Sequence, residues 1–166
     1  YLRHQADRLL VSDVWYEIPL GKRNVGIKLV GYLQYVEQVP LLLSILRDRT
    51  KVSLLQRLFG GDYVHGGFLR RNAIEFGIRR LMVFGDEVRE ALLGALRDDP
   101  YFEVRAMAAK ALGESMIQSD ELECELVAAL DDSCPEVVIE VIGALGAVAR
   151  GRDIVAHLQR FYLHDS

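Results

Sequence analysis

The chain repeats one phrase of its own sequence at an almost constant interval. Leu96 is matched by Leu130 and Gly113 by Gly146, at offsets of 34 and 33 residues. Both copies read Ala-Leu, then a pair of aspartates, and later Ala-Leu-Gly. A fixed period of this size is typical of stacked helical hairpins, because one hairpin alone is too small to bury its apolar side. The repeat therefore predicts an all-α superhelix and favours a binding surface over a catalytic cleft.

Fainter copies of the phrase extend this reading upstream and predict a single solenoid domain over residues 1–166. About four helical hairpins and a closing helix fill it. The approximate units are residues 1–36, 39–84, 86–115 and 119–149, with the closing helix at 152–163. The second unit carries an insertion at 51–67, which contains a glycine-flanked loop from Gly60 to Gly67. Insertions in repeat proteins emerge on one face, often the binding face.

Composition excludes several classes of protein. Hydrophobic residues make up 51% of the chain, which is enough for an ordinary globular core. Cys124 and Cys134 have neither a CxxC spacing nor a nearby histidine, so we expect no disulfide framework and no zinc site. The longest apolar run, residues 137–149, is too short to span a membrane, and we expect no membrane insertion and a cytoplasmic location. The chain begins at Tyr1 without a methionine, and we expect it to be a piece of a longer protein.

Charge is divided unevenly along the chain. Residues 1–83 carry 13 Lys and Arg against 7 Asp and Glu, a net of +6. Residues 84–166 carry 7 against 17, a net of −10. Opposite charge at the two ends can orient a partner or favour head-to-tail association, or it can reflect solvated faces alone. The oligomeric state stays open.

The phrase from Leu96 to Gly113, Leu-x-Asp-Asp-x-x-x-x-Val-Arg-x-x-Ala-x-x-Ala-Leu-Gly, resembles the HEAT repeat. The similarity is to the short bacterial form that is also found in phycobilisome lyases. In that family an aspartate in the turn and an arginine early in the second helix form a ladder between neighbouring repeats. Asp98 or Asp99 with Arg105, and Asp48 with Arg70, fit this structural role. Valine stands at the arginine position of the last unit, so the resemblance implies that the ladder ends there.

The resemblance also implies that the second helix of each hairpin lines the concave side. Transferred by offset, the outward positions on these helices are Lys28, Arg71, Glu75, Arg79 and Lys110. They predict a groove with a basic N-terminal half, which suits an acidic or mixed-charge protein segment because guanidinium groups match planar anions.

Two further sets of residues are candidates for contact. Tyr63 and His65 lie in the expected glycine loop, where they either touch a ligand or pack onto the adjacent repeat. In the last unit the outward positions are apolar: Ile139, Gly143 and Ala147. A helix that is apolar all round is covered on both sides, here by the closing helix or by a further repeat, or else it forms an interface.

The leading hypothesis is therefore a non-catalytic scaffold that binds a protein partner through the concave face and the insertion. One alternative is nucleic-acid binding by Arg70, Arg71, Arg79 and Arg80, which the net charge of −4 disfavours. Another is a lyase or chaperone role on a tetrapyrrole-bearing partner, which only the family resemblance suggests. We find no catalytic, metal or cofactor constellation, and the four histidines, His4, His65, His157 and His164, are scattered.

Overall fold

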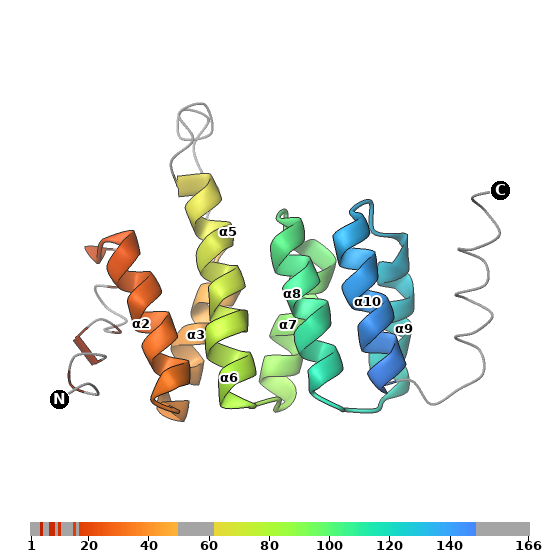
Figure 1. The fold of residues 1–166 in the computed structure, drawn as a ribbon, viewed down its shortest axis with the longest axis horizontal. Helices are drawn as coiled ribbons and strands as arrows, with labels where there is room; N and C mark the ends of the chain where they lie inside the picture. The colour runs from red at the N-terminus through yellow and green to blue at the C-terminus, as the bar shows by residue number, and fades with distance from the viewer. Residues whose placement is uncertain are drawn as a thin grey trace.

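The protein is a row of helical hairpins (Figure 1). The computed structural model describes residues 17–49 and 62–148, with residues 4, 7, 8, 10 and 15, and gives the backbone alone for 62–65. Within these residues all regular structure is helical, which confirms the predicted all-α solenoid. Most of residues 1–16 of the first unit, residues 51–61 of the insertion and the closing helix expected at 152–163 lie outside the described residues. The helices run in the order α2 (Leu20–Tyr32), a 3-10 turn (Val36–Gln38), α3 (Val39–Arg47), α5 (Asp62–Asn72), a π-helix (Ala73–Ile78), α6 (Arg79–Leu81), α7 (Asp86–Asp98), α8 (Phe102–Glu114), α9 (Asp120–Ala128), a 3-10 turn (Ala129–Asp131) and α10 (Pro135–Val148).

The beginnings of two helices follow from local chemistry. Pro135 occupies the first position of α10, where its missing N–H costs nothing and its fixed φ suits the helix. Ser119 caps α9, because its side-chain oxygen accepts a hydrogen bond from the Leu122 N–H at 3.1 Å. The aspartate pairs at the ends of α7 and α9 precede the short connections to α8 and α10. These connections set the two helices of a hairpin side by side.

The second unit differs from the expected loop between Gly60 and Gly67. Helix α5 begins at Asp62 and continues through the π-helix and α6 to Leu81. Glycine usually interrupts a helix, but here Gly67 is needed for packing: a Cβ at this position would lie 2.6 Å from the Tyr101 ring. In the π-helix the Arg79 N–H donates to the carbonyl of Ile74, five residues back.

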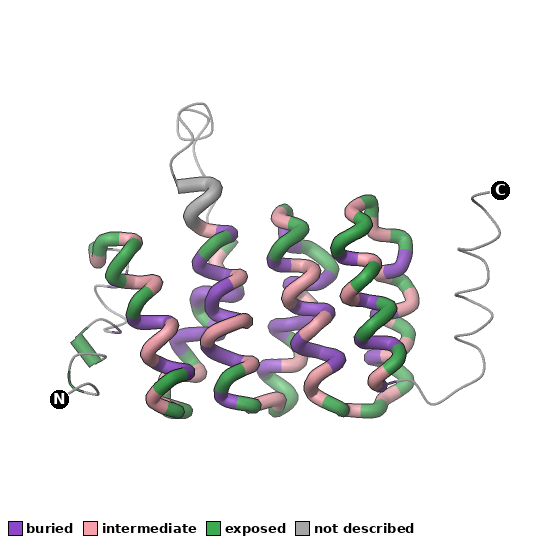
Figure 2. Tube along the Cα trace, in the orientation of Figure 1, coloured by how far each residue is buried: buried purple, intermediate pink, exposed green. Residues whose placement is uncertain are grey.

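A continuous core runs between the helices. Figure 2 shows buried residues recurring along each helix on the side that faces its neighbours. In α7 and α8 the apolar residues that recur at helical spacing form the buried side, and Leu92 and Val104 are fully buried. Neighbouring hairpins share these residues, so each unit completes the core of the next.

Glycines near the C-terminal ends of two second helices allow neighbouring backbones to approach closely. A Cβ on Gly31 of α2 would lie 1.9 Å from the carbonyl oxygen of Phe76. A Cβ on Gly113 of α8 would lie 2.7 Å from the Cα of Ala144 in α10. No side chain fits at such distances, so these two glycines are required by the spacing between hairpins.

Arginine and aspartate join consecutive hairpins. Arg70 of α5 donates to both carboxylate oxygens of Asp99, at 2.7 and 3.2 Å, and to the backbone carbonyl of Asp48 at 3.2 Å. One unit later, Arg105 of α8 donates to both carboxylate oxygens of Asp132, at 2.6 and 2.9 Å, and to the carbonyl of Asp99 at 2.9 Å. The same three-bond arrangement thus occurs twice in the described part of the chain.

The partners in this ladder differ from those expected. Each arginine binds the carboxylate of the following unit and only the backbone carbonyl of its own turn. Asp98 is exposed, whereas Asp99 is buried and takes the role in the ladder. The reason is local, because the Asp99 carboxylate also accepts the Tyr101 N–H and is thereby turned toward the preceding unit. The Cys134 N–H holds Asp132 in the same way.

Candidate functional site

The second helices form one side of the row. Figure 1 shows α2, α5, α8 and α10 side by side in front, with α3, α7 and α9 behind them. We call the exposed side of α2, α5–α6, α8 and α10 the second-helix face. The positions expected to bind a partner lie on these helices.

Arg79 is held by a carboxylate of the next second helix. Its Nε donates to Glu114 at 2.6 Å, and its Nη2 donates to the other oxygen of the same carboxylate. The Arg79 side chain is 21% exposed, and its hydrogen bond to Glu114 raises the pKa of the guanidinium. Its third nitrogen approaches the sulfur of Met107 at 3.6 Å. Arg79 and Glu114 therefore form one bidentate unit that bridges α6 and α8.

The other predicted cations are also paired. Arg71 lies 2.7 Å from Glu75, one turn along the same helix. Lys110 of α8 lies 3.7 Å from Glu140 of α10. Lys28 of α2 sits 4.7 Å from the centre of the Phe76 ring, a cation–π contact with the next second helix. The structure thus brings the predicted residues into contacts with neighbours.

Paired charges alter the electrostatics expected for this groove. Each of the predicted cations, Lys28, Arg71, Arg79 and Lys110, has an anion or an aromatic ring beside it, and charges of both signs lie on this face. The Arg70 side chain is not exposed on this face, because it is buried and paired with Asp99. Arg80 lies 5.0 Å from the centre of the Tyr32 ring. The expected cluster of four arginines is therefore divided among four different environments.

Tyr63 and His65 belong to the first turns of α5, and their side chains lie outside the described residues. The prediction of a glycine-framed loop is wrong for residues 62–67, because these residues are helical. Whether either side chain meets a ligand stays a prediction.

The last second helix has one apolar side exposed. Ile139 is 66% exposed and Gly143 is exposed, while Ala147 is half-buried. The structure adds Ile142, 41% exposed, and Gly146, which sequence reasoning missed. Both residues could have been predicted from the repeat, because the offset of 33 residues places them at the positions of Ala109 and Gly113 in α8. The opposite side of α10 is buried against α8 and α9.

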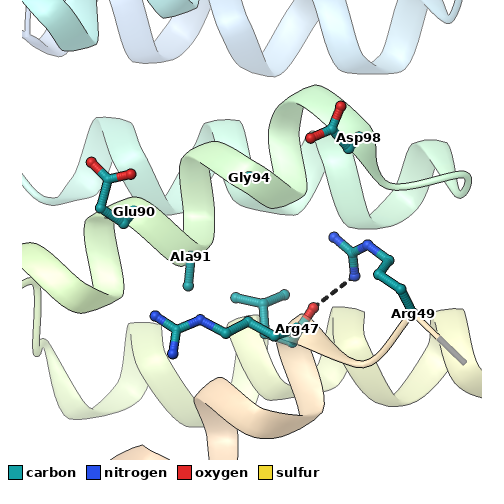
Figure 3. A pocket seen from close by; sticks show the side chains of 7 residues that line it. Arg47, Arg49, Glu90, Ala91, Gly94 and Asp98 are labelled. Carbon is teal, nitrogen blue, oxygen red and sulfur yellow. Dashed lines mark hydrogen bonds between the residues drawn. The ribbon is translucent and has the colours of Figure 1, made fainter.

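A hollow of about 410 Å³ lies on the other side of the row, between α3 and α7 (Figure 3). In Figure 3 two arginines form one wall, and Glu90 and Asp98 flank Gly94 on the other. Arg49 is fixed there by donating to the Leu46 carbonyl at 2.8 Å. No sequence pattern pointed to this hollow. Its lining residues are Leu46, Arg47, Arg49, Glu90, Ala91, Gly94 and Asp98.

Among the described residues, no three His, Cys, Asp or Glu side chains gather in a way that could hold a metal ion. Cys124 and Cys134 are free thiols, and a hydrogen bond to Glu136 raises the pKa of Cys134. No helix among residues 17–49 and 62–148 is both long and apolar enough to cross a bilayer.

Comparison with known proteins agrees with this architecture. A family model described as HEAT repeats matches residues 89–166. The match covers the hairpins α7–α8 and α9–α10 and continues to the last residue. A comparison with curated proteins gave no match.

Proposed function

Since the chain is a HEAT-like repeat protein, we propose that it is a non-catalytic scaffold that binds a partner polypeptide on its second-helix face. HEAT repeats generally mediate protein–protein interaction. Two cross-helix charge pairs on this face, Arg79 with Glu114 and Lys110 with Glu140, are the observation that carries the proposal. Such pairs fix the positions of charged groups before a partner arrives, which lowers the entropic cost of binding.

The charge pattern indicates the chemistry of the partner. Glu114 is 34% exposed beside Arg79, and Lys110 and Glu140 are 40% and 36% exposed. Both signs are therefore accessible within single pairs, and a segment of mixed charge matches them better than a purely acidic one. Complementary charges of this kind contribute to the choice of partner and to association rate more than to affinity.

The insertion at 51–67 is the second element of the proposed surface. Figure 1 shows α5 extending past the ends of α2 and α8. Tyr63 and His65 belong to this projection, and tyrosine is enriched among the residues that contribute most to protein interfaces. Partner contact through these two residues is part of the proposal.

Nucleic-acid binding has less support. A phosphate backbone needs several cations that are free to displace its counterions. Arg70 and Arg79 are instead engaged with Asp99 and Glu114. The cytoplasmic location and the absence of catalysis remain parts of the proposal.

A charge swap tests whether the second-helix face recognises the partner. The double variant Arg79→Glu with Glu114→Arg keeps an ion pair between α6 and α8 but reverses its direction. We expect its urea midpoint to stay near that of the wild type, while partner capture from the native source falls. The single variant Arg79→Glu, which sets two carboxylates side by side, should lose stability as well.

The matched control is a swap on the opposite side of the row. Arg47 and Glu87 form an ion pair at 2.9 Å between α3 and α7. The double variant Arg47→Glu with Glu87→Arg should capture the same partners as the wild type. If the Arg79 and Glu114 swap also captures them undiminished, the second-helix face is not the binding surface.

A further inference from the structure

Two exposed methionines occupy equivalent places in neighbouring hairpins. Met82 follows α6 and Met116 follows α8, at an offset of 34 residues, and each lies in the turn that leads to the next hairpin. Arg79 and Glu114, which stand just before these turns, bind each other, so the turns are neighbours. Figure 1 shows both turns at one edge of the row, the lower edge in that view. We call Met82 and Met116 the methionine pair.

Both methionines have a backbone conformation that favours glycine. The φ angle is 52° at Met82 and 54° at Met116, in the left-handed region. Each N–H donates to the carbonyl three residues back at 3.3 Å, so one turn geometry occurs twice. Glycine is the residue that usually ends a helix in this way. The chain thus places a large apolar side chain where the backbone favours none.

The fold does not use these two side chains for its core. Met82 and Met116 are 65% and 66% exposed. The residues that follow them, Val83 and Ile117, pack against the core and supply the apolar contacts of the two turns. A strained and exposed apolar residue at the same place in two successive units indicates contact with another molecule.

Carboxylates lie beside the methionine pair. Asp86 and Asp120 begin α7 and α9, four residues after each methionine. The Asp86 side chain is 95% exposed, and Asp120 is exposed as well. Acidic residues in a first turn also suit the helix dipole, so by themselves they would not indicate a ligand. Next to two exposed methionines they set the charge that a partner must carry.

We propose that the methionine pair is a docking surface for an amphipathic helix of a partner protein, one that carries lysine or arginine beside its apolar side. Methionine is flexible and adapts to apolar side chains of different shapes. Asp86 and Asp120 favour basic side chains at the rim of the contact. This surface is separate from the second-helix face and goes beyond the proposed function.

The spacing of the two turns favours a helical partner over an extended one. Neighbouring packed helices lie about 8–10 Å apart, which sets the approximate distance between the methionines. Residues seven apart on one side of an α-helix are separated by about 10.5 Å. Residues on one side of an extended strand recur at about 7 Å and 13 Å, which fits less well. We therefore expect large apolar residues seven positions apart in the partner helix.

A synthetic peptide tests this surface in the full chain. The probe is a fluorescein-labelled helix of about 20 residues, with leucines seven positions apart and lysines beside them. Fluorescence anisotropy should show that Met82→Gly with Met116→Gly weakens binding about tenfold. The same peptide with glutamate for every lysine should bind wild type about tenfold more weakly. The control is Phe102→Ser at the other end of α8, where Phe102 is 38% exposed; its binding should match the wild type.

The double variant has a second expected effect, measured without the peptide. Glycine relieves the left-handed backbone at both turns, so the urea midpoint should rise while peptide binding falls. A lower midpoint would mean that the methionines support the fold, and it would overturn the proposal.

Three binding results also overturn the proposal: undiminished binding by the double variant, equal binding of the glutamate peptide, or equal weakening by Phe102→Ser. Self-association of the wild type in sedimentation, lost in the double variant, would assign the edge to a second copy of the chain instead. These variants leave Arg79 and Glu114 unchanged, so a failure here is separate from a failure of the proposed function.

Discussion

Replacing Arg105 with methionine removes one link of the ladder between hairpins. Arg105 donates three hydrogen bonds, two to the Asp132 carboxylate and one to the Asp99 carbonyl. Methionine keeps the apolar stem of the side chain and removes only the charge and the donors. The variant therefore measures the polar contribution of the link with little change in packing.

The expected loss follows from the burial of the pair. The Arg105 and Asp132 side chains are 15% and 10% exposed. Breaking a fully buried pair costs about 3–5 kcal/mol, because the remaining charge has no partner. The Asp132 carboxylate keeps the Cys134 N–H and some solvent, so we expect about 2–3 kcal/mol for Arg105→Met.

Urea unfolding of a double-mutant cycle is the assay. Asp132→Asn is the second variant, because the amide oxygen still accepts the Cys134 N–H. We expect a coupling free energy of about 1.5–3 kcal/mol between Arg105 and Asp132. The matched control is the pair Arg97 and Glu125, whose side chains are 46% and 26% exposed. Its coupling should not exceed about 0.5 kcal/mol.

The reasoning fails if the two cycles give the same coupling. It also fails if Arg105→Met loses less than about 0.5 kcal/mol, the range of ordinary surface substitutions. Either result would mean that apolar packing alone joins the hairpins.

Three other predictions concern stability. The hydrogen bond from Arg105 lowers the pKa of Asp132 in the folded protein. The pair therefore contributes fully to stability above the unfolded pKa of about 4, and this contribution is lost as pH falls through the lower folded pKa. Urea unfolding between pH 7 and pH 2 should show this loss, and Arg105→Met should reduce it; equal acid sensitivity of the two proteins would refute the assignment. Gly113→Ala should lower the free energy of unfolding by about 1–3 kcal/mol, because the new Cβ would lie 2.7 Å from the Cα of Ala144. A gain in that free energy would show that α8 and α10 are less tightly packed. Ser119→Ala should cost about 1 kcal/mol through the lost cap of α9, and Ser119→Asp should restore most of it.

Much of the fold could be predicted because each repeat places the same types of residue at helix ends and on buried sides. The aspartate pairs and prolines mark where helices stop and restart, and the apolar stripes mark which side is buried. The start of α5 at Asp62 could not be predicted in this way. Glycines normally break helices, and the need for a glycine at position 67 comes from the Tyr101 ring, which belongs to a distant part of the chain.

The candidate site was only partly predictable for a related reason. The offsets placed Arg79 and Lys110 on second helices, which follows from helical periodicity alone. Their pairing with Glu114 and Glu140 depends on how neighbouring hairpins are set against each other, and spacing within a single unit does not reveal this. The same holds for the ladder, in which Arg105 reaches across to the next unit.

Labelling of lysines with and without the bound partner tests the central claim, that the second helices form the binding face. Lys28 and Lys110 lie on that face, and Lys22 lies about 240° round α2 from Lys28 at about 100° per residue. Acylation followed by mass spectrometry should show that the partner protects Lys28 and Lys110 and leaves Lys22 reactive. Unchanged labelling of Lys28 and Lys110 in the complex would contradict the claim.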